Sequence, residues 1–506
     1  MKTIQHLLYI LIVVIFASCS TKMTEPQSVS INQTVSIFPD YAGVTVPANI
    51  APLNFYIEEK GIEYQANFVD ASGNGFVVKS DNGVVDIPLK KWHKMLASNA
   101  GKSINVKIFV KDNSGKWVDY QLFTITVSSD NIDSHLAYRI INVGYILWNK
   151  LGLYQRDLTS FRQTAIMLNR NTEGNCMNCH NFNQQDPEQI MFHMRGKYAG
   201  TVIARGDEVK KVNTKTPVTM SAAAYPSWHP GGKHIAFSVN LISQWFHGVD
   251  KKNEVYDRAS DIVVYDIENN EITTSPLVST RQRESLPNWS PDGKYIYFCR
   301  TEEVSESIAW DEVVYDLCRI SYDVETKTWG TVETVLSAAQ AGGSITFPKI
   351  SPDGKWLMFT LADHGYFSIF NKSSDLYLLN LETNDFFPFP FNSGDVDSYH
   401  SWSGNSRWIA FSSKRLDGLC TRPYFTHVDE KGNFSKPFVM PQRDPLFYRS
   451  YKDNYNVPEL VNGKVNINRA SLLEAARDNA LQANFDPNID VDGLSGASRI
   501  EQSVLH

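Results

Sequence analysis

A motif of about twelve residues recurs along the middle of the chain and constrains the fold more than any other feature. Three copies are close and a fourth is looser: Pro226–Phe237, Pro287–Phe298, Pro348–Phe359 and Ser401–Phe411. Their final Phe residues are 61, 61 and 52 residues apart. In the close copies a central Gly predicts a tight turn between two strands. A third strand-like segment follows each: Ser260–Asp266, Tyr315–Ile320 and Ser374–Leu379. Repeats of this kind predict the blades of a β-propeller.

The template Trp-Ser-Pro-Asp-Gly-Lys resembles the repeat of TolB-type β-propellers. The resemblance covers about residues 165–460, where Phe182–Phe192 is a further degenerate copy. Blades of roughly 45 to 50 residues would divide this stretch into six. The resemblance implies a six-bladed propeller that docks proteins or serves as an envelope scaffold. Such blades also occur beside hydrolase domains, but the sequence has no Gly-x-Ser-x-Gly elbow.

The segments that flank the repeats predict three further regions. Residues 36–130 alternate between apolar and polar positions and predict a small β-sandwich. Residues 131–165 carry apolar side chains at helical spacing, so we expect a helical connector there. The propeller is expected over 166–460 and a C-terminal tail over 461–506. In that tail Ser471–Ala483 is a short helical candidate, and the polar stretch from Asp486 is expected to be mobile.

The N-terminus reads as an export signal. Lys2 precedes a short apolar run, and Phe16-Ala17-Ser18-Cys19 resembles a bacterial lipobox in which Cys19 is acylated. We therefore expect a lipoprotein signal over 1–18, a tether over 19–35, and an exported chain in the periplasm or at the cell surface. Its lipid would anchor it to the membrane, the outer membrane if there is one. The alternative is an ordinary cleaved signal in which Cys19 has no role.

Composition excludes several other classes of protein. The 48 Lys and Arg against 55 Asp and Glu give a net charge of −7, which argues against a nucleic-acid partner. Aromatic residues make up 12% of the chain, which favours strands. Six cysteines in 506 residues are too few for a disulfide scaffold. Cys299, Cys318 and Cys420 read as packing residues, although the first two could pair.

One motif carries chemistry. Cys176, Cys179 and His180 have the Cys-x-x-Cys-His spacing of a c-type haem site, in which both thiols bond the porphyrin and the imidazole binds iron. Attachment of this cofactor takes place outside the bacterial cytoplasm, where the leader would direct the chain. The alternatives are a redox-active disulfide, half of a zinc site, or a chance string. No second Cys pair accompanies the motif, which argues against zinc.

Propeller geometry restricts the second iron ligand. The Asp-Gly turns share one face, so the motif is expected on the opposite face. His193 and His247 are the leading metal ligands there, with Met194, His364 and His400 as further candidates. Polar and aromatic residues expected on the same face could hold a haem propionate, a glycan or a peptide: Asn240, Arg300, Lys414, Arg415, Arg422, Tyr225, Tyr399 and Tyr424.

Two functions follow from the sequence. The first is an exported, lipid-anchored propeller that carries one c-type haem for electron transfer or redox sensing, with an unidentified redox partner. The second is a TolB-like binding or scaffold propeller that docks a protein or glycan, with the two cysteines forming only a disulfide. The chain resembles exported bacterial proteins of uncertain function that combine such repeats with one Cys-x-x-Cys-His. No acid-base constellation predicts an enzyme.

Overall fold

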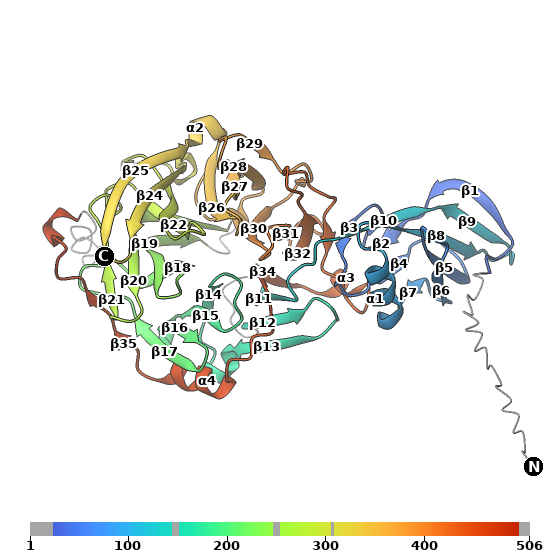
Figure 1. The fold of residues 1–506 in the computed structure, drawn as a ribbon, viewed down its shortest axis with the longest axis horizontal. Coiled ribbons are helices and arrows are strands. Elements are labelled where there is room, and N and C mark those ends of the chain that lie inside the picture. The colour runs from blue at the N-terminus through green and yellow to red at the C-terminus, as the bar shows by residue number, and fades with distance from the viewer. Residues whose placement is uncertain (1–23, 144–150, 246–252, 305–307, 495–506) are drawn as a thin grey trace, which may run out of the picture.

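The computed structural model describes residues 24–143, 151–245, 253–304 and 308–494, which form a small N-terminal unit beside a larger ring of sheets (Figure 1). Cys19 and His247 lie outside the described residues. Within these ranges no helix is both long and apolar enough to cross a membrane. The prediction of a mainly β chain is confirmed.

The N-terminal unit combines two sheets and one helix. Its three-stranded sheet consists of β2 (Ile37–Phe38), β4 (Phe55–Ile57) and β7 (Val84–Val85). The seven-stranded sheet consists of β1 (Ser28–Thr34), β3 (Thr45–Pro47), β5 (Glu63–Asp70), β6 (Gly75–Ser80), β8 (Ser103–Lys111), β9 (Trp117–Gln121) and β10 (Phe123–Ser128). Helix α1 (Leu89–Ser98) buries Trp92 against Phe68, with the ring centroids 6.4 Å apart. Burial of such aromatic side chains drives the sheets and helix together.

The ring contains six sheets of four antiparallel strands, two of them extended by a fifth strand (Figure 1). From the axis outward, the first is β34 (Asp453–Val461), β11 (His135–Asn142), β12 (Gly152–Asp157) and β13 (Gln163–Leu168). The second is β14 (Met177–Phe182), β15 (Gln189–Met194), β16 (Gly200–Arg205), β17 (Glu208–Asn213) and β35 (Leu481–Gln482). The third is β18 (Ala223–Trp228), β19 (His234–Trp245), β20 (Glu254–Asp266), β21 (Glu271–Thr273) and β36 (Asn484–Phe485).

The other three sheets have the same order of strands from the axis outward and consist of four strands each. The fourth is β22 (Glu284–Trp289), β23 (Tyr295–Arg300), β24 (Asp316–Asp323) and β25 (Thr328–Leu336). The fifth is β26 (Ser344–Ile350), β27 (Trp356–Ala362), β28 (Asp375–Asn380) and β29 (Phe386–Pro388). The sixth is β30 (Asp397–Trp402), β31 (Trp408–Ser413), β32 (Arg422–His427) and β33 (Phe438–Val439). This sequential, radial arrangement is that of a β-propeller.

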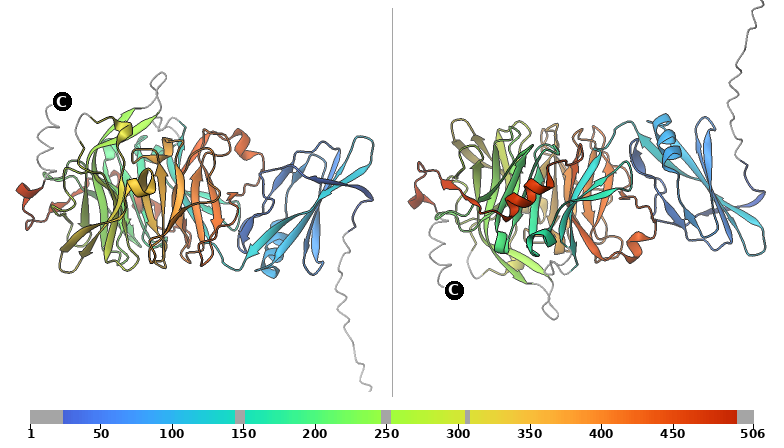
Figure 2. Two further views of the ribbon diagram at one scale, coloured as in Figure 1. Left: turned by 90° about the horizontal axis from the view of Figure 1, so that it is seen from above. Right: turned by 90° about the horizontal axis from the view of Figure 1, so that it is seen from below.

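Short helices occupy the connections between strands. The α-helices are α2 (Ala338–Ala341), α3 (Phe447–Ser450) and α4 (Arg469–Arg477), and the 3-10 helices are η2 (Asn169–Thr172), η3 (Gly196–Tyr198), η4 (Trp310–Glu312), η5 (Ser368–Phe370) and η6 (Val491–Gly493). The N-terminal unit packs beside the sixth sheet, where Asn54 donates to the carbonyl of Arg443 at 2.8 Å (Figure 2).

The repeated motif folds through its own side chains. In the turn between β22 and β23, Gly293 has φ +72°, and the Ser290 hydroxyl donates to Asp292 Oδ1 at 2.6 Å. Ser290 Oγ also accepts a hydrogen bond from the backbone N–H of Tyr295 at 3.0 Å. The turn between β26 and β27 repeats both bonds. Because the turn is fixed locally, the sequence alone predicts it.

The expected helical connector over 131–165 is wrong. This region forms β11, β12 and β13, and β34 from the far end of the chain completes the sheet. The ring therefore begins at His135 rather than at 166. Strand β11 lies between two other strands and is buried on both faces, so its apolar residues do not alternate. Short apolar runs of this kind do not distinguish a buried strand from a helix.

The C-terminal tail packs against the ring, and the expectation that it is mobile from Asp486 is corrected at that residue. Strands β35 and β36 add in parallel to the outer edges of the second and third sheets. Asp486 is buried and accepts a hydrogen bond from Thr273 Oγ1 at 3.2 Å. The predicted helix is present as α4 and ends earlier than expected, at Arg477. Residues 469–486 therefore pack along the outside of the ring.

Candidate functional site

Each of the six innermost strands carries one non-glycine residue with a left-handed backbone. The φ values of these residues lie between 35° and 57°, and the register to the neighbouring strand shifts at each of them. They are therefore β-bulges, which turn a side chain out of the ordinary alternation. We call them the bulge residues: Cys179, Tyr225, Leu286, Phe347, Tyr399 and Val457.

The position after each bulge residue divides the strands into two groups. Four strands have proline there, and two have histidine: Pro226, Pro287, Pro348 and Pro458, against His180 and His400. Proline has no N–H to donate, so the four prolines show that this position needs no ladder hydrogen bond from its own N–H. The fold does not require histidine here, which singles out His180 and His400 as functional candidates.

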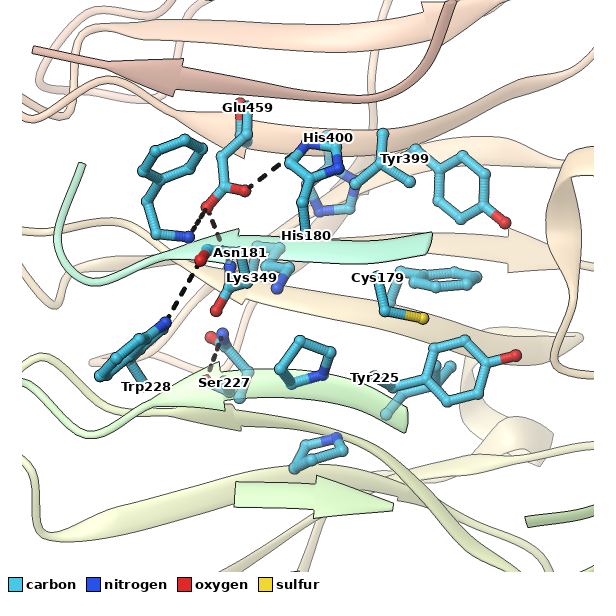
Figure 3. Close-up of a pocket in the computed structure, with 18 of the residues that line it drawn as sticks. Cys179, His180, Asn181, Tyr225, Ser227, Trp228, Lys349, Tyr399, His400 and Glu459 are labelled. Carbon is cyan, nitrogen blue, oxygen red and sulfur yellow. Dashed lines mark hydrogen bonds and ion pairs between the residues drawn. The ribbon is translucent and has the colours of Figure 1, made fainter. Parts of the chain in front are cut away.

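A cavity of about 600 Å³ lies between the innermost strands. Figure 3 shows Cys179, Tyr225 and Tyr399 at one end, and Ser227, Trp228 and Glu459 at the other, with His180 and His400 between them. The apolar end is lined by the bulge residues together with Ile242, Val255, Phe367 and Phe370. The polar end is lined by Asn181, Ser227, Asn288, Lys349, Ser401 and Glu459. An apolar hollow with a few convergent polar groups is the usual form of a small-molecule site.

The Cys-x-x-Cys-His motif lines this cavity. Cys176 directly precedes β14, Cys179 is its bulge residue, and both thiols are free and line the cavity. Cys176 is buried, and burial raises the pKa of its thiol. Cys179 is only partly buried and faces the apolar end, near Tyr225 (Figure 3). The structure thus brings Cys176, Cys179 and His180 to one wall.

His180 is buried without a hydrogen bond. Its side chain is 2% exposed, and neither ring nitrogen has a hydrogen-bond partner. The nearest acidic group is Glu459, whose Oε2 lies 4.0 Å from Nε2. Burial lowers the pKa of His180 to about 3, and the Arg139 charge acts in the same direction. The ring is therefore neutral at physiological pH, which is the form that binds metal ions.

Charged side chains surround the motif on the neighbouring strands. Arg139 in β11 and Arg195 after β15 line the cavity, and the buried Nε of Arg139 has no hydrogen-bond partner. Glu459 in β34 accepts hydrogen bonds at Oε1 from Asn181 Nδ2 and from the backbone N–H of Phe182, both at 2.9 Å. Its Oε2 has no hydrogen-bond partner. Burial raises the pKa of Glu459 to about 7.

The leading second ligand expected from the sequence, His193, does not line the cavity. It lies on the second strand of its sheet, buried, with Nδ1 3.2 Å from Thr201 Oγ1. His400 lines the cavity instead, and its Nε2 is 2.9 Å from the carbonyl of Met358. Sequence reasoning undervalued His400 because its signal, a histidine in the place of a repeated proline, appears only when the innermost strands are aligned.

The other polar residues expected near the motif have structural partners. Arg415 pairs with Asp397 at 2.8 Å, and Arg300 lies 3.3 Å from Glu284. Arg422 is fully buried and donates to the carbonyl of Asp453 at 2.8 Å. Of that group, Tyr225 and Tyr399 line the cavity. Cys299, Cys318 and Cys420 are free and buried, in agreement with packing roles.

No preformed metal centre is evident. Among the described ranges, no group of three or more His, Cys, Asp and Glu side chains is arranged to hold a metal ion.

Comparisons with known proteins give distant likenesses. No family model matches the chain. It is 25% identical to an uncharacterized protein of Agrobacterium fabrum over 188 residues, which are 35% of this chain and 58% of that protein. The match thus spans little more than half the length of that relative.

Solved structures with similar architecture include a putative TolB from Agrobacterium tumefaciens. That chain is 14% identical, with a TM-score of 0.38, and the match covers 62% of this chain and 89% of the other. A putative 6-phosphogluconolactonase from Bacteroides uniformis is 11% identical, with a TM-score of 0.33, over 78% and 98% of the two chains. Likenesses this distant carry no functional argument, so function has to be argued from the cavity.

Proposed function

We propose that this chain is an exported, lipid-anchored, six-bladed propeller that holds one covalent c-type haem in its central cavity and transfers or senses electrons in the cell envelope. The observation that carries the proposal is that all three motif residues line the same cavity. Cys176 and Cys179 are free thiols on the same cavity as His180, a neutral imidazole with no hydrogen bond. These are the donor types that a c-type haem uses.

The rest of the cavity suits a large, flat, partly apolar group. The bulge residues present aromatic and aliphatic side chains at the end where Cys179 lies (Figure 3). Arg139 and Arg195 lie on the same lining and supply positive charge near the thiols. When bound, the haem would supply a one-electron iron couple. The chain's own residues would bind it by thioether bonds, offer His180 as axial ligand, and exclude water from the apolar end.

Spectroscopy and mass of the exported protein test this proposal. The protein is produced with its own leader in a bacterium that matures c-type cytochromes, and a pyridine haemochrome spectrum is recorded. We expect one covalent haem per chain and an intact mass increased by one haem. A spectrum without haem, with an intact mass that lacks the adduct, would contradict the proposal.

The axial ligand has its own control. His180→Ala is expected to retain covalent haem at the thiols but to change the Soret band and the iron coordination. His193→Ala alters a buried histidine that does not line the cavity and should leave both unchanged. Equal spectra for wild type and His180→Ala would mean that His180 is not the ligand.

The lipid anchor is tested separately. Cys19→Ser should move the protein from the membrane fraction to the soluble exported fraction, with its haem content unchanged. An unchanged distribution would favour an ordinary cleaved signal.

The second function is a binding or scaffold propeller that docks a protein or glycan at the cavity. The aromatic and amide side chains that line the cavity favour it, since aromatic surfaces and side-chain amides are common in recognition sites. In that case Cys176 and Cys179 would form a disulfide. A mass lower by two hydrogens than the reduced chain, without a haem adduct, would support this function over the first.

A further inference from the structure

The polar end of the cavity follows a regular pattern that joins each sheet to the next. Two positions after the bulge residue, in four of the six innermost strands, a side-chain oxygen accepts the backbone N–H of the innermost strand in the following sheet. Four strands do this: Ser227 accepts from Trp289 at 2.9 Å, Asn288 from Ile350 at 3.0 Å, Ser401 from Leu460 at 3.1 Å and Glu459 from Phe182 at 2.9 Å. These residues thus have a structural role, because they satisfy backbone donors at the ring axis.

Lys349 occupies the same position in β26 and cannot play that role. A lysine amine only donates hydrogen bonds, so it offers no oxygen to the following strand. The Trp402 indole instead donates to the backbone carbonyl of Lys349 at 2.9 Å. Within the described ranges the Lys349 amine makes no hydrogen bond or ion pair, although it lines the cavity (Figure 3). A cation that does not hold the sheets together is available for a ligand.

Two buried polar atoms lie beside the same space without partners. Glu459 Oε2 and His400 Nδ1 have no hydrogen-bond partner, and His400 is 5% exposed. Both residues are close enough to Lys349 for its charge to affect them. Unsatisfied buried polar atoms are uncommon in proteins, because each costs free energy when it loses water. Both atoms are hydrogen-bond acceptors, because the neutral His400 ring donates from Nε2 to the Met358 carbonyl and an ionised Glu459 only accepts, so a ligand here must bring an O–H group or a bound water beside its anionic group.

We propose that Lys349 binds a carboxylate at the polar end of the cavity, and that the apolar body of the same ligand lies among the bulge residues. The charge of Lys349 selects an anionic group, and Tyr225, Phe347 and Tyr399 favour a flat apolar body. One source of such a carboxylate is a propionate of the haem, and this form rests on the proposed function. The other is a freely diffusing aromatic or aliphatic acid.

Reduction potentials test the haem source. Lys349→Met removes the charge at similar length, and Lys349→Arg keeps it. Loss of a cation beside a propionate favours the oxidised iron, so Lys349→Met should shift the iron equilibrium about tenfold, which is 59 mV lower for a one-electron couple. Lys349→Arg should stay close to wild type. Lys211→Met is the matched control, since Lys211 is a buried lysine of β17, in the outer part of the second sheet, and donates to the carbonyl of Ala476.

Chemical protection tests the free-acid source. Lysines are methylated with formaldehyde and a mild reductant, and the rate at Lys349 is read from peptide masses. Benzoate should slow methylation of Lys349 about tenfold, and the effect should saturate as benzoate is added. A roughly tenfold effect is the size expected when one charge-assisted hydrogen bond protects the amine. Benzamide, which has the same shape without the charge, should not slow it. Lys211 should react at one rate throughout.

The outcomes separate the sources and can overturn the proposal. A haem propionate at Lys349 gives a lowered potential in Lys349→Met and protection before benzoate is added. A free acid gives an unchanged potential and protection only with benzoate. An unchanged potential together with no benzoate protection would overturn the proposal. If the haemochrome spectrum shows no haem, the proposed function fails, and the benzoate experiment still decides the role of Lys349.

Discussion

Strands β14 and β22 have the same backbone and different chemistry. Each has six residues, with a left-handed third residue at φ 51° in Cys179 and 57° in Leu286, and the same shift of register beside it. The next residue is His180 in one strand and Pro287 in the other. Both strands end on a buried aromatic residue. The comparison teaches that the propeller supplies a standard frame, and that a site is made by changing side chains at two positions.

The largest expected effect comes from removing the two thiols of the motif, Cys176 just before β14 and Cys179 within it. Cys176→Ala with Cys179→Ala should abolish covalent haem, because no thioether bond can form. Cys318→Ala with Cys420→Ala removes two buried free thiols that do not line the cavity and should leave haem content intact. Haem staining of denatured protein on a gel measures both. Covalent haem in the double variant would show that the attachment site has been misassigned.

A second prediction concerns Glu284, the first residue of β22. The equivalent residue of β14 is the apolar Met177. Burial raises the pKa of Glu284 to about 8, although Arg300 lies nearby. The unfolded chain releases this proton near the ordinary value of 4.5, so the free energy of unfolding should fall as pH rises towards 8.

Glu284→Gln should make this slope shallower, while buried Glu459, whose pKa is also raised, keeps part of it. Wild type is expected to lose a few kcal/mol more than the variant between about pH 5 and about pH 8, an order-of-magnitude figure from the size of the shift. Urea unfolding at several pH values, followed by tryptophan fluorescence, measures the difference. Parallel pH profiles for the two proteins would contradict the prediction.

A third prediction addresses the bonds between sheets. Ser227→Ala leaves the buried N–H of Trp289 without its acceptor and should lower the free energy of unfolding by about 1–3 kcal/mol. Ser450→Ala, at an exposed serine, should change it by less than about 0.5 kcal/mol. Equal urea midpoints for these two variants would mean that the contact contributes nothing to stability.

The smallest effect is expected at Lys349 and has the opposite sign. Lys349→Ser gives β26 a serine at the position where β18 has Ser227, whose hydroxyl accepts a backbone N–H from the next sheet. The substitution also removes an amine whose pKa is lowered by burial. We expect thermal stability to rise by about 1 kcal/mol while carboxylate binding is lost. A lower melting temperature would show that the amine contributes to the fold itself.

Local features of this protein were predictable from sequence because their causes are local. Ser290, Asp292 and Gly293 close their turn with hydrogen bonds inside a few residues. Because that turn recurs along the chain, the sequence predicted a β-propeller. The Cys176, Cys179 and His180 motif is likewise contiguous, so its presence needed no fold.

Features that depend on distant pairing were not predictable. Strand β11 pairs with β34 more than 300 residues away, and this pairing makes a strand of a segment that reads as a helix. The same pairing brings Glu459 to within 4.0 Å of His180. His400 and Lys349 come from two further sheets, and nothing in their own neighbourhoods marks them as lining one cavity.

The sequence by itself determined the turns, the repeat and the three residues that could attach a haem, because each depends on side chains within a few positions of one another. Tertiary structure alone decided which strands close the ring and which polar groups meet at its axis. The physical reason is that the innermost strands are nearly interchangeable as backbone. What the cavity contains is set by residues from six separate sheets, which share a space only after the ring closes.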